Sequence, residues 1–321
     1  SNIKLDHMIE INNELKKQGR TTGTELIVPL PGESKESFVN GLNNVINSNV
    51  SRVIIYTLMM LHGTHFKLPE YRKKYEYLAK FRIVPLNFGE YDGQKVFDYE
   101  EAGVGTKDLS FEDYLLIRAL GLFVETLYNG KPFKEFFKYA KFYNIQPATL
   151  LQILYDNLSE APKDVQSIVN EFLDETKSEL WDTEKDLLDF YNKEENFNKL
   201  KRGEVGGNLI YKYKSKSLLT ASSSLISFLE NQVLKEVISK QKGIKSIEVI
   251  RSEVKEIANF CSLKINALLD GNADTKPVSG KFDYDILNWL EGENNKRVSE
   301  YRFKNNEKIS SSSINNNLVL Q

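Results

Sequence analysis

The side chains best suited to metal chemistry are two histidines and one cysteine. His62 and His65 lie three residues apart, a spacing that would place two imidazoles on one ion if the segment were helical. Gly63 disfavours a helix there, and no carboxylate or thiolate that could act as a third ligand is close in sequence. We interpret the segment as a turn at the end of a strand. Cys261, the only cysteine, falls in a helical context and is interpreted as a small buried hydrophobe.

Two longer stretches have compositions that are used in binding. Residues 203–207 are glycine-rich, but phosphate-binding loops follow a strand and open a helix, whereas we expect a strand after this stretch. It is therefore interpreted as a turn. Residues 69–79 alternate basic and aromatic side chains, as a nucleic-acid strip would. Nothing basic extends the patch, so we predict an amphipathic helix with a solvated face.

Two single residues also have alternative roles. Glu33 lies at a turn before a helix, where a carboxylate either contributes to a site or simply interacts favourably with the helix dipole. Both roles stay open. Tyr56 lies in the middle of an apolar run and is more often a core tyrosine with one hydrogen bond than a substrate contact.

The elements that position these residues form one strand–helix–strand unit. Residues 26–30 are a short apolar run closed by Pro31 and Gly32, and residues 53–61 are a longer run closed by Gly63. Neither run alternates, so each is predicted to be a strand buried on both faces, as in a parallel sheet. Apolar residues at helical spacing lie between the runs: Phe38, Leu42, Val45 and Ile46. The crossover is expected to be right-handed.

At this point the sequence resembles the late part of a radical-SAM barrel, and most closely the cobalamin-binding subgroup of radical-SAM proteins. The likeness rests on Leu-Pro-Gly-Glu-Ser (residues 30–34), a helix, an apolar strand and Leu-His-Gly-Thr (residues 61–64), in that order. It covers roughly the first quarter of the chain and continues more weakly from Arg82 to Tyr128. In that family the two apolar runs are the fifth and sixth barrel strands. Pro29 stands where the family usually has glycine.

The resemblance implies S-adenosylmethionine and a [4Fe–4S] cluster as cofactors of the full-length protein, with cobalamin as a further candidate. In the family, adenosylmethionine lies across the carboxyl ends of the barrel strands, where parallel barrels generally have their sites. The resemblance therefore implies that the cofactor-binding residues are Val28, Pro29, Leu30, Glu33, Leu58 and Met59.

The cluster ligands of the family are not found in this sequence. A radical-SAM enzyme holds its cluster with a Cys-x-x-x-Cys-x-x-Cys loop, because thiolates hold such clusters, and here only Cys261 is available. The chain also opens with Ser-Asn and passes almost directly into a helix, which suggests the scar of a tag on a truncated chain. We expect the C-terminal part of a longer enzyme that is inactive as it stands, with no catalytic residue, no metal ligand and no bound cofactor.

Two classes of function follow from these observations. In the first, the full protein cleaves adenosylmethionine to a radical, with cobalamin-dependent methyl transfer as one form of the chemistry. The helical residues after about residue 90 would then cover the barrel mouth and shape a substrate pocket. The alternative is a helical protein-interaction module without catalysis. A Cys-x-x-x-Cys-x-x-Cys loop upstream in the parent gene would distinguish the two, but fold likeness does not reveal the substrate.

Composition limits the partners. The 321 residues carry a net charge of −2, which gives no electrostatic reason to expect nucleic acid or an anionic membrane. No apolar run is long enough to span a bilayer and no signal-peptide pattern is present. A single cysteine excludes an internal disulfide and fits a reducing cytoplasm. Hydrophobic residues make up 40% of the chain, enough for packed cores.

The predicted fold class is an α/β N-terminal piece of a partial barrel followed by a mainly α-helical region with a few short strands. We divide the chain at residues 1–90, 91–205, 206–307 and 308–321, the last a polar tail. Helices are predicted over residues 3–17, 110–129, 131–143, 147–158, 161–191 (two helices), 218–240, 250–269 and 282–290, the last with Trp289 buried. Short strands are predicted at residues 82–85 and 95–99 around a turn at 90–93, and at 208–214 and 298–304.

The two parallel strands predict one partner. Two strands are too few for a self-sufficient sheet, and an open apolar edge is a template for pairing with another chain. We therefore expect a homodimer through the first 90 or so residues, with Ile55 as a candidate contact.

Overall fold

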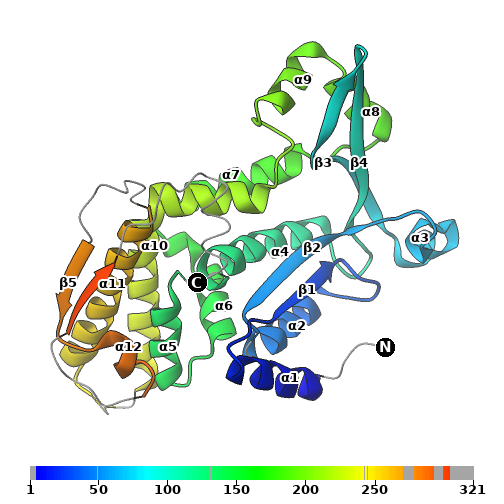
Figure 1. Cartoon of the computed structure of the whole chain (residues 1–321). Coiled ribbons are helices and arrows are strands. Elements are labelled where there is room, and N and C mark those ends of the chain that lie inside the picture. The colour runs from blue at the N-terminus through cyan, green and yellow to red at the C-terminus, as the bar shows by residue number, and fades with distance from the viewer. Residues whose placement is uncertain are drawn as a thin grey trace.

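The computed structural model describes residues 5–48, 50–129, 132–241, 243, 245–269, 278–292 and 299–303. The protein is mainly helical, with a mixed four-stranded sheet in the order β1-β2-β4-β3 and a separate antiparallel pair, β5-β6 (Figure 1). The coarse prediction of an α/β start followed by helices is confirmed. The tail at 308–321 lies outside the described residues.

The predicted strand–helix–strand unit is present. The chain begins with α1 (Leu5–Lys17), followed in order by β1 (Gly23–Val28), α2 (Lys35–Asn47) and β2 (Arg52–Met59). The two strands β1 and β2 pair in parallel. Ser34 caps α2 by accepting a hydrogen bond from the backbone N–H of Ser37, and the Ser37 hydroxyl accepts one from Ser34 in return. The register sets Val28 opposite Thr57.

Only one face of this parallel pair is covered, so the prediction that both faces are buried was wrong. Leu26 and Ile55 are register partners on the face that packs against the main core. Gly121 lies in the helix that follows the sheet in the chain, and a Cβ added to it would lie 3.7 Å from Cδ1 of Ile55. On the opposite face Ile27 and its partner Tyr56 are 43% and 46% exposed. Tyr56 is therefore not a core tyrosine, and Ile55, the predicted dimer contact, lies on the covered face.

One half of the sheet is a long hairpin, with β3 at the edge. β3 (Leu78–Tyr91) and β4 (Gln94–Gly105) are antiparallel, and β4 meets β2 only at Leu58 and Met59. The predicted short strands are parts of these longer ones, and the predicted turn is confirmed at Asp92 and Gly93, which both have positive φ. The predicted helix at residues 69–79 is shorter: η1 (His65–Lys67) and α3 (Pro69–Tyr75) precede β3.

The first helix after the sheet begins as predicted. In α4 (Phe111–Phe123) the Ser110 hydroxyl accepts from the backbone N–H of Asp113, whose side chain accepts in return from Ser110. The helix then widens into a π-helical turn, η2 (Val124–Tyr128). Inserted turns of this kind are frequent at functional sites.

The remaining elements form the helical body at left in Figure 1 and the helices beside the hairpin. They are α5 (Lys134–Phe142), α6 (Pro147–Asp156), η3 (Leu158–Glu160), α7 (Lys163–Ser178), α8 (Glu184–Tyr191), α9 (Glu194–Lys201), α10 (Leu209–Lys240), α11 (Ile247–Leu269), β5 (Val278–Phe282), α12 (Ile286–Trp289) and β6 (Ser299–Phe303). Most predicted helices and the strand at 298–304 are confirmed within a few residues. Cys261 is fully buried as predicted, whereas Trp289 is only partly buried.

One predicted strand is a helix. Residues 208–214 alternate in sequence, yet Asn208 caps α10 and the helix runs on from Leu209, kinked at Ala221. Tyr213 and Lys214 are both buried, which neighbouring residues of a half-exposed strand would not be. Burial of this segment inside the helical body outweighs the alternation in its sequence, and the segment is helical.

The apolar core has two parts. The main core runs from the covered face of β1 and β2 through α4, α5, α6, α7, α10 and α11. A smaller group, which we call the hairpin cluster, lies between the hairpin and α8 and α9; it consists of Ile83, Phe97, Leu187, Tyr191, Phe197 and Leu200. Figure 1 shows the hairpin with α8 and α9 standing out from the body. The division at residue 90 falls near the tip of this hairpin.

Candidate functional site

The strand-end residues implied by the resemblance come together at one end of the parallel pair. Val28 ends β1 and is fully buried, and Leu58 and Met59 end β2 beside it. Leu58 is buried against Gly103 of β4. A Cβ added to Gly103 would lie 3.2 Å from Cδ2 of Leu58. Leu30 and Met59 are exposed and give this end of the sheet an apolar surface.

Glu33 stabilises the turn after β1. Its Oε2 accepts a hydrogen bond from the backbone N–H of Leu30 at 3.4 Å, and the carbonyl of Pro29 accepts one from the Tyr77 hydroxyl at 3.4 Å. Burial raises the pKa of Glu33, and the Leu30 N–H lowers it in part. The contact to Leu30 gives Glu33 a structural role in this turn.

The two histidines lie in different local structures. His62 and Gly63 lie in a turn after β2, as predicted, and His65 begins η1 with its ring 5.8 Å from that of Tyr71. Over the described parts of the chain, no group of three His, Cys, Asp or Glu side chains could hold a metal ion.

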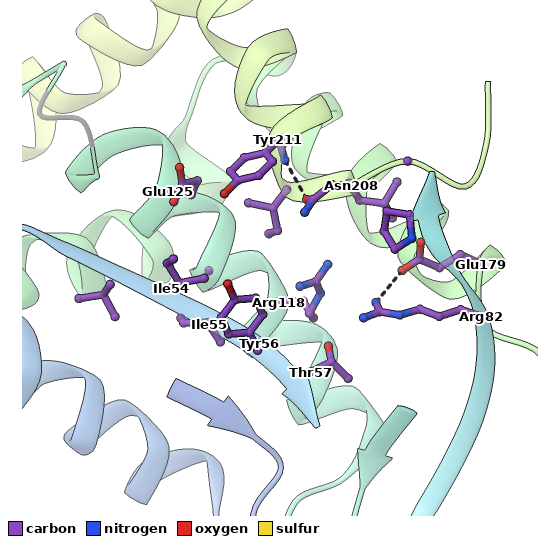
Figure 2. Close-up of a pocket in the computed structure, with 16 residues that line it drawn as sticks. Ile54, Ile55, Tyr56, Thr57, Arg82, Arg118, Glu125, Glu179, Asn208 and Tyr211 are labelled. Carbon is purple, nitrogen blue, oxygen red and sulfur yellow. Dashed lines mark hydrogen bonds and ion pairs between the residues drawn. The ribbon is translucent and has the colours of Figure 1, made fainter. Parts of the chain in front are cut away.

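A polar cavity that was not among the sequence-based predictions lies beside β2. It has a volume of about 250 Å³ and is bounded by Val53–Thr57 of β2, one side of α4 and η2, the middle of β3, the end of α7 and the first turn of α10 (Figure 2). These segments are far apart in sequence. The lining includes the charged side chains of Arg82, Arg118, Glu125 and Glu179.

One edge of β2 opens into this cavity. β2 pairs with β1 along one edge, whereas β4 reaches the other edge only at Leu58 and Met59. At Val53 the side-chain amide of Asn129 substitutes for a strand, with its Oδ1 3.0 Å from the backbone N and its Nδ2 2.7 Å from the carbonyl O. Backbone groups alternate between the two edges of a strand, so Ile55 and Thr57 direct theirs to the same side as Val53.

Each end of the cavity carries an ion pair, one buried and one partly buried. At one end Nζ of Lys214, a fully buried lysine, lies 2.8 Å from Oε1 of Glu125, and the Asn129 amide also donates to this carboxylate. At the other end Nη1 of Arg82 lies 3.1 Å from Oε1 of Glu179. Burial raises the pKa of Glu179, against the lowering effect of the nearby arginines Arg82 and Arg118.

Arg118 differs from these paired groups. It is 8% exposed, and its Nε is buried without a hydrogen-bond partner. It forms no ion pair with a carboxylate of the described residues; its guanidinium carbon lies 5.5 Å from the ring centre of Phe172. Figure 2 shows its guanidinium between Tyr56 of β2 and Asn208 at the start of α10.

A sequence signal for the cavity did exist. Arg118 and Glu125 are the charged residues that interrupt an otherwise apolar run from Tyr114 to Leu127. Residues seven apart in a helix lie on nearly the same face. Two opposite charges on the buried side of an apolar helix would have indicated a polar site, although not its other walls.

Neither a model of a known protein family nor a curated protein matches the chain. None of the described helices is long and apolar enough to cross a membrane.

The thiol donors of the chain do not fit a [4Fe–4S] cluster. Such clusters need several thiolates, and Cys261 is the one cysteine of the sequence. Its Sγ is fully buried 3.5 Å from Oε2 of Glu135, and burial followed by this carboxylate raises its pKa.

Proposed function

We propose that this chain is the C-terminal part of a cytoplasmic radical-SAM iron–sulfur enzyme, which cleaves adenosylmethionine in its complete form. In this proposal β1 and β2 are the last two strands of a partial barrel, and cobalamin-dependent methyl transfer is the form of the reaction that the resemblance suggests. The cluster cysteines belong to a part of the protein outside this sequence.

The observation that carries the proposal is the uncovered face of the parallel pair. Parallel strands normally have both faces covered, yet Ile27 and Tyr56 are exposed and β1 has no second neighbour among the described strands. A barrel would turn this face inward and pair the free edge of β1 with the preceding strand. The strand ends that carry Leu30 and Met59 would then border the cofactor.

The first test is the reading frame that encodes the chain. We expect a Cys-x-x-x-Cys-x-x-Cys loop upstream of residue 1, and its absence would refute the proposal. The complete protein, reconstituted anaerobically with iron and sulfide, should form 5′-deoxyadenosine from adenosylmethionine. This chain alone should gain no cluster absorption under the same treatment, because it has one thiol.

The second test concerns the strand ends. Leu30→Asp in the complete protein should raise the KM for adenosylmethionine at least about tenfold, because it adds a charge beside the proposed adenine position. Leu86→Asp is a matched control, since Leu86 is exposed on β3 away from the strand ends. Equal KM values for the two variants would contradict the proposed position of the cofactor.

A second candidate is a protein-interaction module without catalysis. The same exposed residues, Ile27 and Tyr56, favour it, because an apolar face on a sheet edge also suits another protein. A complete reading frame without the cysteine loop would favour this alternative.

A further inference from the structure

We propose that the cavity beside β2 binds a small molecule through a carboxylate group, which Arg118 and the first turn of α10 hold.

The first reason is the state of Arg118. A buried guanidinium is expected to have a carboxylate or several hydrogen-bond acceptors, because desolvating a charge without a partner is costly. Arg118 is nine-tenths buried, lines the cavity and has no such partner among the described residues. Its planar fork of donors matches the two oxygens of a carboxylate.

The second reason is the first turn of α10. Asn208 Oδ1 accepts from the backbone N–H of Tyr211 at 3.3 Å, and the N–H groups of Leu209 and Ile210 have no partner within the described structure. These three residues line the cavity with Asn208. Free N–H groups and the positive end of a 32-residue helix attract an anion.

The third reason is the balance of charge. The groups that line the cavity, or form ion pairs with its lining, are four cations and three carboxylates: Arg52, Arg82, Arg118 and Lys214 against Glu100, Glu125 and Glu179. One negative charge would balance the set. A monocarboxylate supplies that charge, whereas phosphate at neutral pH carries more than one.

The strand edge indicates what accompanies the carboxylate. Ile55 and Thr57 present backbone donors and acceptors to the cavity, and an amide in the ligand could pair with them as a strand does. The volume of about 250 Å³ is smaller than the cavities that hold drug-sized molecules. An N-acylated amino acid has the right size and both groups.

The test uses N-acetylglycine as the probe, with N-acetylglycinamide as its uncharged match and inorganic phosphate as the competing anion. Titrations of isotope-labelled protein are followed by the backbone amide signals of Ile55, Thr57, Leu209 and Ile210. We expect saturable shifts at these amides with N-acetylglycine, and at least tenfold weaker binding of the amide. Equal affinities for the two probes, shifts elsewhere only, or binding of phosphate alone would overturn the proposal.

A variant pair tests the role of Arg118. Arg118→Lys keeps the charge but loses the fork, so the affinity for N-acetylglycine should fall at least fivefold. Arg202→Lys is the control, because Arg202 is exposed and paired with Glu204. If Arg118→Lys binds as tightly as the control, the proposal fails. If it does not fold, the contrast between the two probes in the unmodified protein still decides.

Discussion

The buried pair of Lys214 and Glu125 permits a quantitative prediction. Lys214 is 0% exposed, and Glu125 is buried too. Lys214→Met would leave the carboxylate with the amide of Asn129 and with Arg52, whose Nη2 is 3.9 Å from Oε1. Removing one partner of a buried ion pair costs about 3–5 kcal/mol, because the remaining charge stays desolvated.

This free energy translates into a measurable shift in Tm. Unfolding entropy is about 2.1 cal/mol/K per residue, which gives roughly 0.7 kcal/mol/K for a chain of this size. Lys214→Met should therefore lower Tm by roughly 4–7 °C. Differential scanning calorimetry measures the shift, and urea unfolding followed by circular dichroism gives an independent free energy of unfolding.

The matched control lies on the same helix. Lys216 pairs with Glu171, and the two side chains are 39% and 46% exposed, so Lys216→Met should cost less than about 1 kcal/mol. The double variant Glu125→Gln with Lys214→Met removes both buried charges and should recover most of the loss. If Lys214→Met destabilises no more than Lys216→Met, or if the double variant loses as much as the two single variants together, the reasoning is refuted.

Three further predictions concern other parts of the fold. Burial raises the pKa of Glu33, so the folded protein binds the proton of the Glu33 carboxyl more tightly than the unfolded chain does. The free energy of unfolding should therefore fall as pH rises through the ordinary titration range of a glutamate. Glu33→Gln should reduce that fall, which urea midpoints measured from about pH 4 to 7 would show. Ser110→Ala removes the cap of α4 and should cost about 1 kcal/mol in the same assay, and no loss would contradict the cap's importance. If the uncovered face joins two chains, Ile27→Lys should shift the mass from light scattering toward the monomer, whereas Leu86→Lys should not; a monomeric unmodified chain would exclude the dimer.

Local signals predicted the elements well. The Ser110 cap and the turn at Asp92 and Gly93 were predictable because each depends on contacts between residues close in sequence. The same holds for the parallel pair, whose apolar runs and intervening helix are contiguous. The error at residues 208–214 came from reading alternation alone; Asn208 after two glycines was a cap signal that pointed to the helix.

The cavity could not be predicted in the same way. Its walls come from β2, β3, α4, the end of α7 and α10, and no local pattern states that Arg118 and Leu209 face one space. The exposure of Ile27 likewise depends on which elements cover the sheet, which apolar runs do not encode. Charges inside the apolar run of α4 were the one local sign of a polar interior.

The hairpin cluster has a consequence for the stability of separate parts of the molecule. Its six buried residues share no member with the main core, so the outer part of the hairpin can open with α8 and α9 without disrupting the helical body, whereas Ala102 and Val104 at the base of β4 belong to the main core. The amides near the hairpin tip should then exchange with solvent deuterium much faster than those in the middle of α10. Arg82 and Pro85 belong to β3 and also line the cavity. Such an opening would therefore remove one wall of the cavity and give a bound molecule a route in and out.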